Sequence, residues 1–150
     1  MKRIASFDVD HDLISKGLYI SRIDGDITTY DMRTREPNKG DYMSNVAMHS
    51  MEHMFATYIR NSEIGEYVIY FGPMGCRTGF YLLIRDLSAD VVSKFVKDTL
   101  AKIIGHDGEM FGASRKECGN YLELDLDAAK EEAKAYLAVL ESKEITFRYC

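Results

Sequence analysis

The chain has 150 residues, of which 46% are hydrophobic, and this composition favours a globular fold over a disordered chain. The formal net charge is −5, which argues against nucleic acid as the main partner, because phosphate binding needs clustered Lys and Arg. No apolar run reaches the roughly 18 residues of a membrane helix, and no signal peptide is recognisable. We therefore expect one cytoplasmic domain over residues 1–150, with no membrane segment.

The first half of the chain predicts a hairpin and then a helix. Two β-rich runs in Gly17–Thr34 flank Asp24–Asp26, and Asp-Gly between such runs is typical of a β-hairpin turn. The stretch Met43–Asn61 contains many helix formers and neither Gly nor Pro. It predicts a helix with Ser44 or Asn45 as its N-cap.

The second half predicts strands that alternate with helices. Glu66–Phe71 and Gly79–Asp86 are typical of strands, and a helix between the cap Ser88 and the terminal Gly105 follows them. Alternation predicts a further strand over Asn120–Leu126.

The last part of the chain completes the predicted fold. Asp127 would cap a helix that runs to Ser142, and the tail Glu144–Cys150 would add a short strand. Short links between neighbouring strands favour antiparallel pairing. We therefore predict an α+β fold, in which an antiparallel sheet packs against helices and a central helix carries a metal site.

Two histidines and a glutamate share one side of the predicted helix Met43–Asn61. At 100° per residue, His49 and His53 lie about 40° apart, and Glu52 completes an arc of about 100°. Two imidazoles at this spacing can bind one zinc-like ion, and a neighbouring carboxylate can carry protons. The alternative is an ordinary polar, solvated helix face, and the helix alone leaves both interpretations open.

Two other functions compete for the same motif. The order H-x-x-E-H also occurs in inverzincin proteases, so a metallopeptidase is an alternative that needs a further ligand, usually a carboxylate. A non-catalytic domain with a structural ion is a second alternative, and it would fill all four metal positions with protein ligands.

The three cysteines are Cys76, Cys118 and Cys150, and an odd number in a reducing compartment argues against a disulfide framework. A thiolate at Cys118 suits an ion of borderline softness, and the adjacent Gly119 allows a close backbone approach. The alternative for Cys118 is an inert buried thiol. Cys150, the last residue, is expected to be frayed and without a role.

Cys76 lies in the sequence GPMGCRTG, which predicts a tight connection between two strands. We expect its thiol to be partly exposed there. Arg77 would favour the thiolate if its guanidinium comes near, and a thiolate can act as a base or nucleophile. The alternative is a turn cysteine without a function.

Five segments together resemble one known family. They are HSMEHMFA at His49–Ala56, PMGCRTGFY at Pro73–Tyr81, ECGNY at Glu117–Tyr121, SFDVDH at Ser6–His11 and YDMRTREPN at Tyr30–Asn38. In this order they resemble the S-ribosylhomocysteine lyases, the autoinducer-2 synthases also called LuxS. The resemblance extends over nearly the whole chain.

The resemblance implies a homodimer with two identical sites at its interface and a small-molecule substrate, S-ribosylhomocysteine. Cleavage of the thioether would yield homocysteine and 4,5-dihydroxy-2,3-pentanedione, the precursor of the signal autoinducer-2. It also implies one divalent ion per subunit, expected to be Fe(II), for which zinc or cobalt can substitute.

The resemblance also implies roles for the residues of the central helix and the cysteines. His49, His53 and Cys118 would be the metal ligands, with water or a substrate oxygen in the fourth position. Glu52 and Cys76 would be the two catalytic acid/base groups.

Three further residues would bind the substrate. Arg33 would hold it, and Ser6 and His11 would reach over the site of the neighbouring subunit. The sequence departs from the family pattern at Tyr70, where many members have an aspartate six residues before the turn cysteine. The partner of Arg60, which matches a family arginine near that aspartate, is therefore expected to differ.

Overall fold

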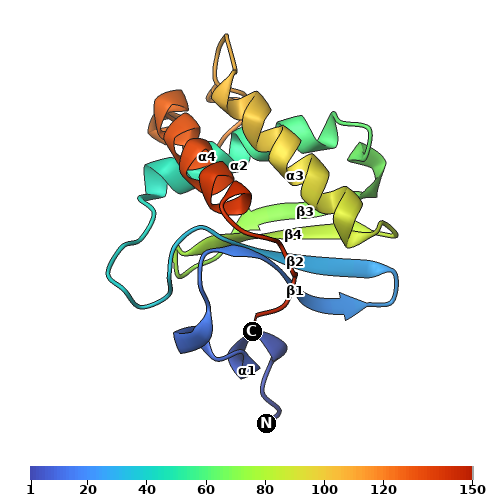
Figure 1. The fold of residues 1–150 in the computed structure, drawn as a ribbon. Helices are drawn as coiled ribbons and strands as arrows, with labels where there is room; N and C mark the ends of the chain where they lie inside the picture. Colours follow the sequence, from blue (N-terminus) through green and yellow to red (C-terminus); the bar gives the residue numbers. More distant parts are fainter. Residues whose placement is uncertain (150) are drawn as a thin grey trace.

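The computed structural model describes residues 1–149 and is built on a four-stranded antiparallel sheet (Figure 1). The strands are β1 (Gly17–Asp24), β2 (Ile27–Arg33), β3 (Val68–Pro73) and β4 (Gly79–Arg85). Their order across the sheet is β1-β2-β4-β3, so that each hairpin contributes two neighbouring strands. The predicted hairpin and strand pair are confirmed, as is the α+β class.

Three helices cover one face of the sheet, whereas the N-terminal residues lie on the other side (Figure 1). The helices are α2 (Asn45–Arg60), α3 (Ala89–Ile104) and α4 (Leu126–Glu141). The short elements are α1 (Ala5–Asp8) and the 3-10 turns η1 (His11–Leu13), η2 (Gly65–Tyr67) and η3 (Tyr121–Glu123). Helix α2 packs against β3, α3 and α4, which makes it the central helix of the layer.

The predicted caps explain where two of these helices begin. The hydroxyl of Ser44 accepts a hydrogen bond from the N–H of Ala47 at 3.0 Å, and Ser88 accepts from Val91 at 3.4 Å. Each bond satisfies an amide that the helix itself leaves without a partner. Both caps agree with the sequence-based predictions, and Gly105 ends α3 as expected.

The apolar side of α2 forms the middle of the hydrophobic core. Met51, Met54, Phe55 and Ile59 are fully buried there. Phe55 stacks on Phe71 of β3 with 4.4 Å between the ring centroids. Because this side holds the helix on the sheet, the opposite side is available for His49 and His53.

The predicted strand at Asn120–Leu126 is wrong. The segment forms the turn η3 and then enters α4, and the side chain of Leu122 is 83% exposed. The predicted cap is also wrong, because Asp125 and not Asp127 accepts the first helical amides. A tertiary contact holds the cap in place, since the N–H of Asp125 donates to Ser50 on α2 at 2.8 Å.

The tail after α4 forms no regular strand within residues 142–149. Only Phe147 pairs with the sheet, through an isolated parallel bridge to Tyr19 on β1. The predicted short tail strand is therefore reduced to one bridge. Cys150 lies outside the described residues.

No helix within residues 1–149 has both the length and the apolar composition needed to cross a membrane.

Candidate metal centre

Helix α2 and the loop before η3 bring three potential metal ligands together. One ligand atom each from His49, His53 and Cys118 lies within 4.8 Å of the others. The sulfur of Cys118 lies 3.4 Å from Nε2 of His49. The predicted common arc of the two histidines is confirmed, because their rings meet edge to face with 4.8 Å between centroids.

A backbone carbonyl orients the ring of His53. Nδ1 of His53 lies 2.9 Å from the carbonyl oxygen of Phe111, and since a carbonyl only accepts, Nδ1 carries the proton. Nε2 therefore keeps its lone pair for a metal ion. Gly112 permits this approach, because a Cβ at Gly112 would lie 2.9 Å from Nδ1 of His53 and its φ is +64°.

A carboxylate orients the ring of His49. Nδ1 of His49 lies 3.0 Å from Oε1 of Glu123. The side-chain amide of Asn120 donates to Oε2 of Glu123 at 3.3 Å. Such a carboxylate selects the tautomer and raises the basicity of the metal-binding nitrogen. The contact of Glu123 could not be predicted, because the alternation in Asn120–Leu126 indicates a strand, whereas a 3-10 turn follows Cys118 there.

The three residues fit one divalent ion of borderline softness. Two imidazoles and a thiolate suit such an ion, and ligand atoms of a tetrahedral site with bonds of about 2.0–2.3 Å lie about 3.3–3.8 Å apart. The separation of 3.4 Å between Cys118 and His49 falls in this range. The N–H of Asn120 donates to the sulfur of Cys118 at 3.4 Å, which stabilises a thiolate.

Glu52 precedes His53 on α2 and is half-buried, as are both histidines. It thus lies on the same helix as the two candidate imidazole ligands, between His49 and His53. Its acid/base role stays a prediction.

Cys76 lies in the turn between β3 and β4, and it is exposed as expected. Its sulfur lies 3.0 Å from the hydroxyl oxygen of Thr78, which also accepts a hydrogen bond from Arg33 at 2.9 Å. Arg77 instead donates to the carbonyl of Met43 at 3.3 Å. The guanidinium that bonds Thr78, the hydrogen-bond partner of Cys76, is therefore that of Arg33. The sequence had suggested Arg77 as the cation near Cys76.

Arg33 is 3% exposed and forms a buried ion pair with Asp31, which is 1% exposed. The carboxylate of Asp31 accepts two hydrogen bonds from Arg33, at 3.0 and 2.5 Å. Burial lowers the pKa of Arg33, but Asp31 and the proximity of Cys76 outweigh burial and hold it above its usual value. Arg33 is thus a permanent cation, and its predicted contact with substrate stays a prediction.

The N-terminal residues lie on the side of the sheet away from the helices (Figure 1). Ser6 lines a cavity of about 540 Å³ together with Tyr70 and Tyr81. Nδ1 of His11 lies 2.8 Å from the carbonyl of Val9, to which it donates. Within residues 1–149 of one chain, no hydrogen bond joins Ser6 or His11 to the candidate metal ligands, and their substrate-binding roles stay predictions.

The departure from the family pattern at Tyr70 changes the surroundings of Arg60. Tyr70 is 50% exposed. The guanidinium of Arg60 donates to the carbonyls of Val68 and Ile69, at 3.4 and 3.1 Å. Backbone oxygens of β3 therefore take the place of the side-chain partner expected near this position.

Glu123→Ala should weaken metal binding about 10- to 100-fold, because His49 loses the group that fixes its tautomer and orientation. Titration against a chromophoric chelator measures the dissociation constant. The matched control is Glu117→Ala, since Glu117 lies in the same region but bonds Ser114. Equal dissociation constants for the two variants would show that Glu123 does not support the ion.

The chain is similar to known proteins over nearly its whole length. The family model described as S-Ribosylhomocysteinase (LuxS) matches residues 4–146. The S-ribosylhomocysteine lyase of Borreliella burgdorferi strain ZS7 is 43% identical over an alignment of 156 positions, which covers 99% of each chain. The S-ribosylhomocysteine lyase of Phocaeicola vulgatus is 43% identical over an alignment of 143 positions, which covers 91% of this chain and 89% of that relative. The S-ribosylhomocysteine lyase of Clostridium acetobutylicum is 40% identical over an alignment of 148 positions, which covers 95% of this chain and 94% of that relative.

The matched range contains all of the candidate ligands and acid/base groups described above, from His49 to Cys118. The extent of the family match and the identity to these relatives over most of both chains lead to one conclusion. The chain belongs to the S-ribosylhomocysteinase (LuxS) family.

Proposed function

We propose that this protein is a metal-dependent S-ribosylhomocysteine lyase that produces homocysteine and 4,5-dihydroxy-2,3-pentanedione. Family membership and the activity in the names of its relatives support the proposal. The observation that carries it is the convergence of His49, His53 and Cys118, with both imidazoles held through their Nδ1 atoms.

The substrate dictates what the site must do. The sulfur is bonded to C5 and the aldehyde carbon is C1, so the carbon–sulfur bond is not activated for elimination. A carbonyl at C3 would make the C4 proton acidic and place the sulfur β to the carbanion. The carbonyl must therefore migrate from C1 to C3, and each shift removes a proton from one carbon and returns one to its neighbour.

Two side chains are assigned to these proton transfers. A divalent ion held by His49, His53 and Cys118 would supply Lewis-acid polarisation of the carbonyl. Cys76, as a thiolate, takes the C2 proton, and Glu52 performs the later transfers. In the elimination Glu52 takes the C4 proton, which gives an enolate with a C3–C4 double bond. Its electrons then form a C4–C5 double bond as the C3 carbonyl returns, and the bonding pair of C5–S leaves with the sulfur, which takes up a proton as homocysteine. The remaining enol at C4 tautomerises by protonation at C5, which gives 4,5-dihydroxy-2,3-pentanedione.

The homodimer belongs to this proposal, with Ser6 and His11 contributed to the site of the neighbouring subunit and Arg33 to substrate binding. Exposed apolar side chains of the N-terminal segment support it: Ile4 is 56%, Phe7 64% and Leu13 61% exposed. Large exposed apolar side chains that form a contiguous patch are typical of an interaction surface. Iron as the native ion is the part of the proposal that rests on the family resemblance. The cytoplasmic location remains the expectation from the sequence.

The metallopeptidase alternative receives no support from the comparisons. The geometry also differs from what it needs, because the third candidate ligand is the thiol of Cys118. The nearby carboxylate of Glu123 instead contacts Nδ1 of His49, on the side of the ring away from the candidate ligand atom.

Incubation of the Fe(II)-loaded protein with S-ribosylhomocysteine should release one homocysteine per substrate, and a thiol reagent measures it. Chelator-stripped protein is the control, and it should recover the activity when Fe(II) is restored. A mixture of unstructured peptides, incubated in parallel, should remain intact. Peptide cleavage, or no thiol release by fully loaded protein, would contradict the proposed function.

A further inference from the structure

The tail that follows α4 crosses the sheet at β1, and we refer to residues 142–149 as the C-terminal strap (Figure 1). Ile20 on β1 donates its N–H to the carbonyl of Phe147 at 2.9 Å. Lys143 donates to the carbonyl of Lys16 at 2.5 Å. The strap is therefore tied to the β1 region at both of these points. Its last residues lie beyond position 146, where the family match ends.

Phe147 turns the strap in a conformation that bulky residues rarely adopt, with φ at +62°. Its ring meets Tyr30 edge to face with 6.3 Å between centroids. Tyr30 belongs to the core, so this packing compensates for the unfavourable backbone. The turn is thus determined by tertiary contacts.

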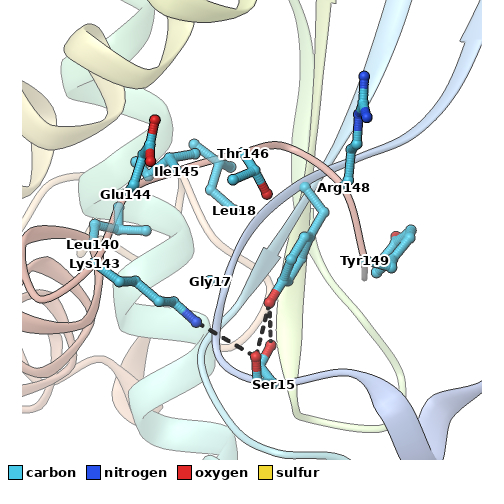
Figure 2. Close-up of a pocket in the computed structure, with 11 residues that line it drawn as sticks. Ser15, Gly17, Leu18, Leu140, Lys143, Glu144, Ile145, Thr146, Arg148 and Tyr149 are labelled. Carbon is cyan, nitrogen blue, oxygen red and sulfur yellow. Dashed lines mark hydrogen bonds between the residues drawn. The ribbon is translucent and has the colours of Figure 1, made fainter.

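Tyr149 is the last residue of the strap. Residues of the strap line a cavity of about 230 Å³. Figure 2 shows Tyr149 and Ser15 among its lining residues. The ring of Tyr149 stacks on Tyr19 at 4.8 Å, and its hydroxyl donates to Oδ2 of Asp31 at 2.8 Å. Burial, together with Asp31, raises the pKa of Tyr149, so the hydroxyl keeps the proton that it donates.

This hydroxyl begins a chain of contacts that ends at Cys76. Asp31 accepts from Tyr149 and from Arg33 through the same oxygen, Oδ2. Arg33 donates to Thr78 at 2.9 Å, and the Thr78 hydroxyl lies 3.0 Å from the sulfur of Cys76. Asp31, Arg33 and Thr78 are 1%, 3% and 1% exposed. Because little water reaches these groups, the position of each depends on its neighbours.

We propose that Tyr149 is a positioning residue, which holds Asp31 and, through Arg33 and Thr78, sets the orientation of the Cys76 thiol. The role in turnover rests on the proposed function, in which Cys76 transfers protons. Without the hydroxyl, the unshared charge of Asp31 draws Arg33 away from Thr78. The guanidinium then stabilises a thiolate at Cys76 less well.

Tyr149→Phe tests this coupling, because it keeps the stacked ring and removes only the hydroxyl. The matched control is Tyr19→Phe, since the hydroxyl of Tyr19 bonds Ser15 and not Asp31. The quantities to be measured are kcat and KM with S-ribosylhomocysteine, the content of bound metal, and the rate at which iodoacetamide alkylates Cys76 at pH 7. Mass spectrometry of the Cys76 peptide gives the alkylation rate.

For Tyr149→Phe we expect kcat to fall about fivefold, with KM within about twofold and metal content unchanged. Alkylation of Cys76 should slow about threefold. Tyr19→Phe should keep the original values of both rates. Removal of residues 149 and 150 should slow alkylation at least as much as Tyr149→Phe.

Equal alkylation rates in the original protein and Tyr149→Phe would overturn the proposal, as would equal losses in the two Phe variants. Either result leaves the lyase function standing if the original protein releases homocysteine. Conversely, slower alkylation in Tyr149→Phe alone, with no homocysteine release by the original protein, supports the positioning role and contradicts the proposed function.

Discussion

Cys118→Ala should lose the metal ion and, with it, homocysteine release. The substitution removes the only thiolate of the ligand set and leaves two neutral imidazoles, His49 and His53, to hold a divalent ion. We expect less than about a tenth of the original metal content after dialysis, and turnover lower by more than about 100-fold. Elemental analysis and the thiol-release assay measure the two quantities.

The control for this loss is Cys76→Ala, which removes a thiol from the turn between β3 and β4 without touching a candidate ligand. Circular dichroism on both variants separates loss of the ion from loss of the fold. Full metal content in dialysed Cys118→Ala would show that the ion is bound by other residues.

Cys76→Ala should keep the metal ion and stop turnover. Because the proposed reaction needs a base at C2, loss of the thiolate should lower kcat by about 10²- to 10⁴-fold. The exposed position of Cys76 makes the substitution mild for the fold. Single-turnover measurements of homocysteine release, on protein of known metal content, check this expectation.

Cys76→Ser is the matched variant, since its hydroxyl can still hydrogen-bond to Thr78 but is a far weaker base than a thiolate. It should be nearly as inactive as Cys76→Ala. If either variant releases homocysteine at the original rate, Cys76 is not the base and the assigned proton transfers are wrong.

Much of the fold could be predicted from local patterns. The helix around His49 and the caps Ser44 and Ser88 depend on residues within one or two turns, and these predictions are confirmed. Asn120–Leu126 shows where such patterns fail. Its alternation predicted a strand, but the N–H of Asp125 is held by Ser50, 75 positions earlier, and the segment turns into α4.

In the candidate site, too, local patterns could be predicted from the sequence, whereas contacts between distant residues could not. His49 and His53 could be paired from their helical spacing, and the resemblance indicated Cys118. The partners that orient the imidazoles could not be predicted, because Glu123 and Phe111 are 74 and 58 positions from the histidines they contact.

The sequence by itself determined which side chains can bind an ion and move protons, because helical periodicity and the chemistry of His, Cys and Glu are local properties. Only the tertiary structure decided which cation bonds Thr78, the hydrogen-bond partner of Cys76. Arg77 is adjacent in sequence, but its backbone lies at φ +62° and its guanidinium bonds Met43. Arg33 reaches Thr78 across 45 positions, since pairing of β2 with β4 places Arg33 opposite Gly79.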